Sequence, residues 1–82
     1  MPRLLLFGQL RGYAEGLHGA EIETSATSMS DLLNWLGQHH PELSEALARP
    51  GVRYAVDGCF ADTKTPILPR SEIALMSPLS GG

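Results

Sequence analysis

One amphipathic helix, with short strand-like segments on both sides of it, constrains the fold of this chain more than any other feature. Ser28, followed three residues later by Asp31, matches a capping-box start, in which the serine oxygen accepts a backbone N–H and the acid suits the positive helix end. Pro41 predicts an end at about His39 or His40, because the residue before a proline is pushed out of the α region. Apolar residues at helical spacing form one stripe between these ends: Met29, Leu32, Leu33 and Leu36.

The rest of the chain predicts one shorter helix and several short strands. Pro41 in a first turn with early acidic residues predicts a second helix up to Leu47, ended by Pro50-Gly51. Residues 59–70 contain two prolines, so we expect one short strand there at most. The dipeptide Asp57-Gly58 predicts a turn. Apolar or alternating runs predict strands at residues 3–7, 21–24, 53–56 and 72–76.

These elements together predict an α+β domain. Strands on both sides of one main helix favour a mixed sheet of roughly four or five strands, with the main helix on one face. That arrangement is the β-grasp (ubiquitin-like) fold. We expect the first two strands to form a hairpin across a long, irregular connection, residues 8–19, which contains four glycines. The predicted division is a β-grasp domain over residues 1–76 and an extended tail over residues 77–82.

Length and charge exclude several classes of protein. With 82 residues the chain has room for one domain, since domains usually contain about 50–200 residues. The net charge is −3, whereas nucleic-acid-binding proteins normally carry a basic stripe. The longest apolar runs contain four residues, and a membrane span needs about 20. One cysteine excludes an internal disulfide framework. We therefore expect a cytoplasmic protein that binds neither nucleic acid nor membrane.

Few residues could perform chemistry inside this domain. His39 and His40 are adjacent and cannot share a helix face, and His18 stands alone among glycines, so we expect all three to be solvated or to cap helices. Cys59 has no second cysteine with which to bind zinc, and we expect a small, semi-buried hydrophobic residue. The motifs HExxH and CxxC and the Walker phosphate loop are absent. We therefore predict no catalytic residue, no metal site and no cofactor bound by the chain alone.

The two glycines at the end of the sequence, Gly81 and Gly82, are its most distinctive motif. Because glycine has no Cβ, the terminal carboxylate could enter a narrow channel. Pro78 and Leu79 would hold the tail extended away from the domain. A carboxylate is a poor electrophile, so acyl chemistry would require activation, for example by ATP. A Gly-Gly end on a β-grasp domain therefore indicates that this carboxylate is the reactive group of the chain.

Both ends of the sequence resemble one family. The segment Phe7-Gly8-Gln9-Leu10-Arg11 is similar to the FAQLR-type opening of molybdopterin synthase small subunits, the MoaD-type sulfur carriers. Residues 72–82, EIALMSPLSGG, are similar to that family's E-V-A-x-x-P-P-V-[ST]-G-G ending. The resemblance covers the whole chain at matching length. The sequence departs from the family pattern at Ser77 in place of the first of two prolines, at Leu75 and Met76 in place of common aromatics, and at Asp57 in place of an Asn.

The resemblance implies a reaction at Gly82. A partner adenylating enzyme would use Mg-ATP to convert the carboxylate into an acyl-adenylate, and a sulfur donor would then make it a thiocarboxylate. The sulfur would pass to a pterin precursor in the large subunit of molybdopterin synthase, typically a heterotetramer of two small and two large subunits. The large subunit would supply the catalytic groups. The residues that would enter its active site are Pro78, Leu79, Ser80, Gly81 and Gly82.

Alternation of side chains along the last strand predicts a docking surface. We expect Ile73 and Leu75 to point into the core. Ala74 and Met76 would then point outward and, with apolar residues of the first strand such as Phe7, form a patch for partners. Methionine suits a surface that fits two partners in turn, because its side chain is flexible. The opposite orientation, with Met76 in the core and Leu75 outside, stays open.

Two loop cations allow further interpretation. Arg11 either pairs with an acidic partner surface or is a solvated loop arginine, and it is included among the candidate interface residues. Lys64, the only lysine, has no motif around it and is expected to be a solvated charge.

Three other functions fit the sequence. A carrier for thiazole synthesis or another sulfur-transfer pathway would share the fold and the Gly-Gly end, although such carriers are commonly shorter. A non-carrier β-grasp binding module would make Gly81 and Gly82 dispensable. A ubiquitin-like modifier would be conjugated to lysines through Gly82.

Overall fold

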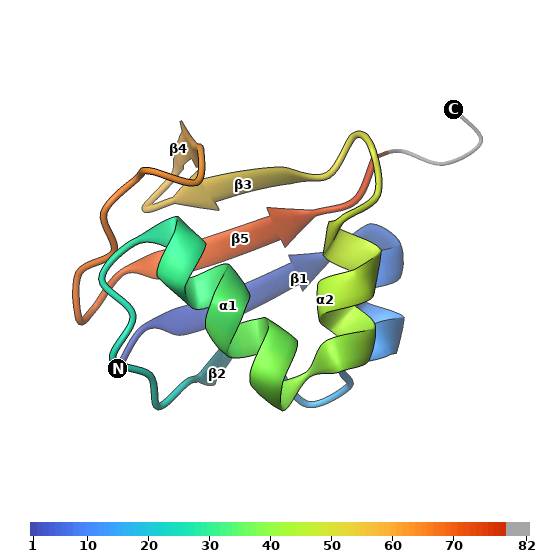
Figure 1. Ribbon diagram of the computed structural model, residues 1–82, viewed down its shortest axis with the longest axis horizontal. Helices are drawn as coiled ribbons and strands as arrows, with labels where there is room; N and C mark the ends of the chain where they lie inside the picture. Colours follow the sequence, from blue (N-terminus) through green and yellow to red (C-terminus); the bar gives the residue numbers. More distant parts are fainter. Residues whose placement is uncertain (79–82) are drawn as a thin grey trace.

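The structure, a computed structural model, describes residues 1–78 (Figure 1). Within this range the strands are β1 (Arg3–Phe7), β2 (Ala20–Glu21), β3 (Arg53–Val56), β4 (Cys59–Ala61) and β5 (Glu72–Met76). The helical segments are the 3₁₀-helix η1 (Gly8–Tyr13) and the α-helices α1 (Met29–His39) and α2 (Pro41–Leu47). None of the helices in this range is long and apolar enough to cross a membrane.

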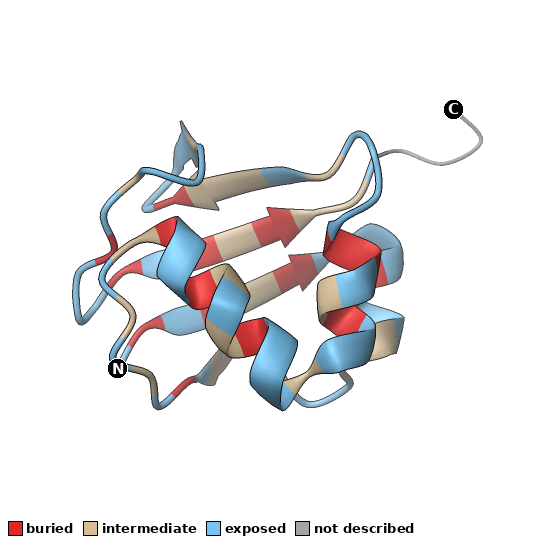
Figure 2. Cartoon of the chain, viewed as in Figure 1, coloured by how far each residue is buried: buried red, intermediate tan, exposed pale blue. Residues whose placement is uncertain are grey.

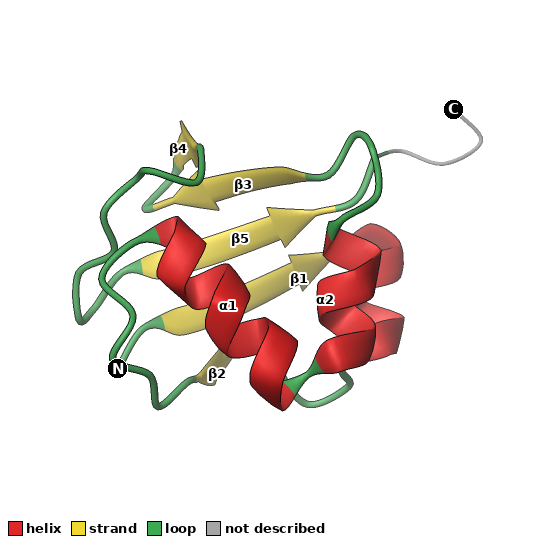
Figure 3. Ribbon diagram, viewed as in Figure 1, coloured by secondary structure: helices red, strands yellow, loops and turns green. Residues whose placement is uncertain are grey.

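The sheet is mixed, and the first and last of its strands are neighbours at its centre. The strand order is β2-β1-β5-β3-β4, in which β1 and β5 run parallel and the other neighbours run antiparallel. The parallel register runs from Arg3 opposite Glu72 to Phe7 opposite Met76. A parallel pair needs a crossover connection, and α1 within that connection crosses in front of β1 and β5 in Figure 3. This is the predicted β-grasp arrangement.

The main helix begins and ends where the sequence predicts. Ser28 Oγ accepts the backbone N–H of Asp31 at 3.1 Å. The Asp31 carboxylate accepts both the N–H and the hydroxyl of Thr27, at 3.3 and 3.1 Å. The last helical residue is His39, and His40 is the cap residue before α2 begins. The Ser28 bond satisfies one of the N–H groups that the first turn of a helix leaves unpaired, and the Asp31 bonds attach Thr27 to that turn.

The hydrophobic core lies between one face of the sheet and the helices. Figure 2 shows buried residues alternating along β1 and β5 and recurring along α1 and α2. Met29, Leu32 and Leu36 of the predicted stripe are fully buried, and Leu33 is half-buried. Each fully buried leucine contributes about 1.5–3 kcal/mol relative to an exposed one. The buried apolar residues are Leu4, Leu6, Leu10, Ile22, Met29, Leu32, Leu36, Leu43, Ala46, Leu47, Val56, Ile67, Ile73 and Leu75.

A two-residue turn joins β3 to β4. Asp57 and Gly58 have φ angles of 51° and 84°, the positive values that a type I′ turn requires at both positions. The turn places Val56 opposite Cys59. The predicted turn is confirmed, and β4 is the one short strand expected within residues 59–70.

Two predictions for the first half of the chain are wrong. Residues 8–19 do not form an irregular connection throughout, because Gly8, with φ of 66°, turns the chain directly from β1 into η1. The predicted strand at 21–24 is Ala20–Glu21 only. Beyond Glu21 one more bond joins the Ile22 N–H to the Pro2 carbonyl at 2.8 Å. The Thr24 hydroxyl then accepts the N–H of Ala26, two residues later, in a local turn.

The prediction for Cys59 is also wrong, since its side chain is exposed rather than semi-buried. β4 is the outermost strand and pairs with β3 alone. Because β4 has only three residues and, within residues 1–78, no strand on its outer side, neighbouring side chains cover little of Cys59.

Candidate functional site

The two faces of β5 differ in burial. Ile73 and Leu75 have no exposed surface and belong to the core. Ala74 and Met76 alternate with them and are half-buried on the opposite face. The predicted orientation of the last strand is confirmed, and the opposite orientation is excluded.

Strand pairing extends this second face across the sheet. Ala74 lies between Leu5 of β1 and Ala55 of β3. Ala55 in turn pairs with Phe60 of β4, whose side chain is 75% exposed. Residues paired directly across neighbouring strands point to the same face. The four side chains therefore form one row, with a large aromatic ring at its outer end.

A second row runs beside the first. Met76 lies between Phe7, which is 44% exposed, and Arg53. Unlike the core face, this side of the sheet has exposed aromatic rings, which is typical of a docking surface. We call it the open face, formed by Leu5, Phe7, Ala55, Phe60, Ala74 and Met76.

Charged side chains border the open face. The Arg53 guanidinium lies over the Phe60 ring, 5.9 Å from its centroid, in a cation–π contact. At the other end, Arg3 and Glu21 form an exposed ion pair at 3.9 Å, which contributes at most about 1 kcal/mol. An apolar centre with a charged border is the usual anatomy of a protein–protein interface.

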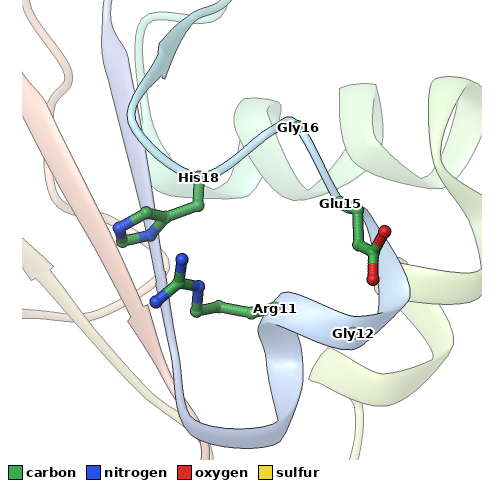
Figure 4. A pocket seen from close by; sticks show the side chains of 5 residues that line it. All are labelled: Arg11, Gly12, Glu15, Gly16 and His18. Carbon is green, nitrogen blue, oxygen red and sulfur yellow. The ribbon is translucent and has the colours of Figure 1, made fainter.

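A cavity of about 320 Å³ opens beside β1 (Figure 4). In Figure 4 the guanidinium of Arg11 turns toward the imidazole of His18. That imidazole meets the Phe7 ring edge-on, with centroids 5.8 Å apart, so the cavity adjoins the open face. Arg11 is exposed, and its role at an interface stays a prediction. The lining residues are Arg11, Gly12, Glu15, Gly16 and His18.

The structure corrects the prediction for His18. This half-buried residue is neither a solvated group nor a helix cap, because its Nδ1 accepts the backbone N–H of Leu6 at 2.9 Å. β2 pairs with β1 only at Arg3 and Leu4, so His18 supplies the acceptor that a longer β2 would have given. The neutral ring must then carry its proton on Nε2.

The other two histidines lie where solvated or capping groups were predicted. His39 is exposed and stacks on Trp35, with ring centroids 4.5 Å apart. His40 is the residue between α1 and α2. Across residues 1–78, no group of three or more His, Cys, Asp or Glu side chains is placed to hold a metal ion.

The predicted tail begins beside η1. Ser77 Oγ accepts the N–H of Gln9 at 3.1 Å, and Pro78 is exposed. The other predicted tail residues, Leu79, Ser80, Gly81 and Gly82, lie outside the described residues.

Sequence reasoning missed the part of the open face that β3 and β4 supply. Ala55 and Phe60 belong to it, and a signal for both was present. A two-residue turn at Asp57-Gly58 fixes the register of the hairpin and places residue 60 opposite residue 55. For His18 the sequence has no such signal, because the group it binds is a backbone N–H of β1, 12 residues away.

Residues 4–82 match the model of the ThiS family, so the match spans nearly the whole sequence. The chain belongs to the ThiS family. ThiS-family proteins are ubiquitin-like sulfur carriers and modifiers that work with partner enzymes. A comparison with curated proteins found no match.

Two solved structures are similar to this ThiS-family chain. One is SAMP1 from Haloferax volcanii, 23% identical with a TM-score of 0.77, aligned over 99% of this chain and 98% of that one. The other is small archaeal modifier protein 1 of H. volcanii, 20% identical with a TM-score of 0.79, aligned over 95% and 97%. At these identities the likeness establishes the β-grasp fold alone.

Proposed function

We propose that this ThiS-family protein is the sulfur carrier subunit of molybdopterin synthase and acts in the cytoplasm. Residues 7–11 and 72–82, both similar to MoaD-type carriers, support this branch. The observation that carries the proposal is the Gly-Gly motif at 81–82, which follows the open-face residue Met76 closely in sequence. Chain length also favours this branch over the commonly shorter thiazole carriers.

The chemistry would take place at the carboxylate of Gly82. A partner adenylating enzyme uses Mg-ATP, and attack of the carboxylate oxygen on the α-phosphorus releases pyrophosphate and leaves an acyl-adenylate. Sulfur at the sulfide level (HS⁻ or its equivalent from a donor) then attacks the acyl carbon, displaces AMP and leaves a thiocarboxylate. The carrier contributes the acyl group and no catalytic residue, because activation and transfer occur in its partners.

Docking on the open face would bring the tail to the same partner. Phe7, Ala74 and Met76 offer apolar surface whose burial supplies affinity. Arg11 at the border would pair with a partner carboxylate and fix the orientation of the complex. Two small and two large subunits would form the synthase, with residues 78–82 of each small subunit in the active site of a large one.

Intact mass spectrometry tests the carrier reaction. The chain is incubated with the adenylating enzyme, Mg-ATP and a sulfur donor, and we expect a species heavier by the difference between one sulfur and one oxygen atom. Fragmentation should place the change on Gly82. A variant that lacks Gly82 is the matched control and should stay unmodified. A wild-type chain that keeps its original mass would contradict the proposal.

Reconstitution separates the molybdopterin branch from the thiazole branch. The thiocarboxylated chain is given either the large molybdopterin synthase subunit with a pterin precursor, or a thiazole synthase with its substrates. We expect consumption of the thiocarboxylate and dithiolene formation in the first mixture only. Consumption by the thiazole synthase alone would assign the chain to the other pathway.

Protein modification is the second candidate function. The structural likeness to a small archaeal modifier protein favours it, since the same Gly-Gly end can be joined to lysine amines. Tagged chain in cells would then give a ladder of isopeptide-linked conjugates that disappears when Gly81 and Gly82 are deleted. A single band would exclude modification. If the chain without Gly81 and Gly82 kept its full function, it would instead be a non-carrier binding module.

A further inference from the structure

The first residue beyond β5 is linked to the start of η1 by its side chain. Ser77 Oγ accepts the backbone N–H of Gln9 at 3.1 Å, and its hydroxyl donates to the carbonyl oxygen of Phe7 at 3.4 Å. Pairing between β1 and β5 ends at Phe7 and Met76. The two bonds of Ser77 therefore attach the chain to the domain one residue further than the sheet does.

Two glycines lie against this segment, Gly8 beside Ser77 and Gly51 beside Pro78. Gly8 has φ of 66°, and a Cβ there would collide with the Ser77 hydroxyl. Gly51 has φ of 88°, and a Cβ there would lie 3.0 Å from Cβ of Pro78. At both positions the positive φ favours glycine, and an added Cβ would force the Ser77 hydroxyl or the Pro78 ring to shift. Gly8 and Gly51 therefore lie close to Ser77 and Pro78, the last two residues that the structure describes.

The backbone is restrained at both of these residues. The ring of Pro78 fixes φ at its own position. The residue before a proline is also restricted to extended backbone, and at residue 77 the two side-chain bonds add to that restraint by attaching it to η1. Ordering a residue costs conformational entropy, and here the fold has met that cost before any partner binds.

We propose that Ser77 is a positioning residue for the reaction at Gly82. Its hydroxyl holds residue 77 against the start of η1, so that for a partner docked on the open face the tail begins at one fixed point. The inference rests on the proposed function. Groups that are already held in position react faster, because less entropy is lost when they reach the reactive geometry. Ser77 acts through the tail rather than on the reacting atoms.

Two substitutions at this position form a matched pair. Ser77→Ala removes both bonds at nearly constant volume, and Ser77→Thr retains the hydroxyl. With the adenylating enzyme and Mg-ATP, we expect Ser77→Ala to lower kcat/KM for adenylation of Gly82 about fivefold. This is about the effect of losing the bond to Gln9, since the 3.4 Å bond to Phe7 is long and weak. We expect Ser77→Thr to restore most of the wild-type value. Kd for the same enzyme without ATP should be unchanged in both variants.

Amide hydrogen exchange in the free chain gives a readout that needs no partner. We expect the Gln9 N–H to exchange faster in Ser77→Ala and to regain protection in Ser77→Thr. The Leu6 N–H, which donates to His18, is an internal control and should keep its protection in both variants. Loss of protection at Leu6 as well would mean that the domain itself has loosened, which would overturn a role confined to the tail.

The outcomes separate this inference from the proposed function. Wild-type chain that is never adenylated would overturn the carrier function and the positioning role with it. Normal adenylation of wild-type chain together with equal kcat/KM in Ser77→Ala would overturn the positioning role alone. A parallel rise in Kd would also overturn it, because Ser77 would then be part of the docking surface. A fall in kcat/KM at constant Kd, restored by threonine, supports it.

Discussion

Gly8, Gly12 and Gly16 lie close together in the stretch that the sequence marks only as rich in glycine. In the fold they differ. Gly8 has a positive φ, and a Cβ there would displace the Ser77 hydroxyl, whereas Gly16 has a positive φ of 87° and open space around it. Gly12 has open space and an ordinary backbone conformation within η1. Gly8 is therefore constrained by both space and backbone conformation, Gly16 by conformation alone and Gly12 by neither.

Alanine substitutions should separate these requirements. We expect Gly12→Ala to change the free energy of unfolding by less than about 0.5 kcal/mol. Gly16→Ala should lower it by about 1–2 kcal/mol, the cost of a left-handed conformation with a Cβ. Gly8→Ala should lower it further, because the Ser77 hydroxyl must also move. Urea unfolding of the three variants gives the order, and a Gly8→Ala no worse than Gly16→Ala would contradict the crowding at Ser77.

At the scale of elements, the helix α1 shows how local bonds define an element. Its first turn is closed by Ser28 and by the bonds between Asp31 and Thr27, all within four residues of one another. β2 has no comparable local signal, and its length depends on pairing with β1. This difference explains why the bounds of α1 were predictable and those of β2 were not.

Removing the cap should weaken α1. We expect Ser28→Ala to lower the free energy of unfolding by about 1 kcal/mol, because the N–H of Asp31 loses its acceptor. For a domain of this size that corresponds to a fall in Tm of roughly 4–8 °C. Ser30→Ala, an exposed position in the same first turn, is the control and should leave Tm nearly unchanged. Equal effects of the two substitutions would show that the cap contributes nothing.

At the scale of the whole molecule, we expect the two faces of the sheet to separate stability from recognition. Its core face holds the fully buried residues Leu4, Leu6, Ile73 and Leu75. Its open face holds half-buried and exposed residues that do not belong to the hydrophobic core. Substitutions on the open face should therefore change binding while the fold persists.

Met76→Glu tests this separation. We expect Kd for the large synthase subunit to rise about tenfold or more, because docking would bury an unpaired carboxylate against apolar surface. The free energy of unfolding should stay close to that of wild type. Asn34→Glu, at an exposed position of α1, is the matched control for added charge and should leave Kd unchanged. Unchanged affinity of a folded Met76→Glu variant would contradict docking through the open face.

The sequence by itself determined the features that depend on residues close together in the chain. The cap at Ser28, the stop at Pro41, the turn at Asp57-Gly58 and the alternation along β5 are all of this kind. They fix the element order, and with it the β-grasp fold and the orientation of Met76.

Only the tertiary structure decided which distant groups meet. His18 accepts the N–H of Leu6 across 12 positions of sequence, and Ser77 accepts the N–H of Gln9 across 68. Phe60 joins Ala74 on the open face only because β3 lies between β4 and β5. The bonds of His18 and Ser77 end on backbone N–H groups, which every residue type except proline carries, so the sequence holds no pattern that marks these two contacts in advance.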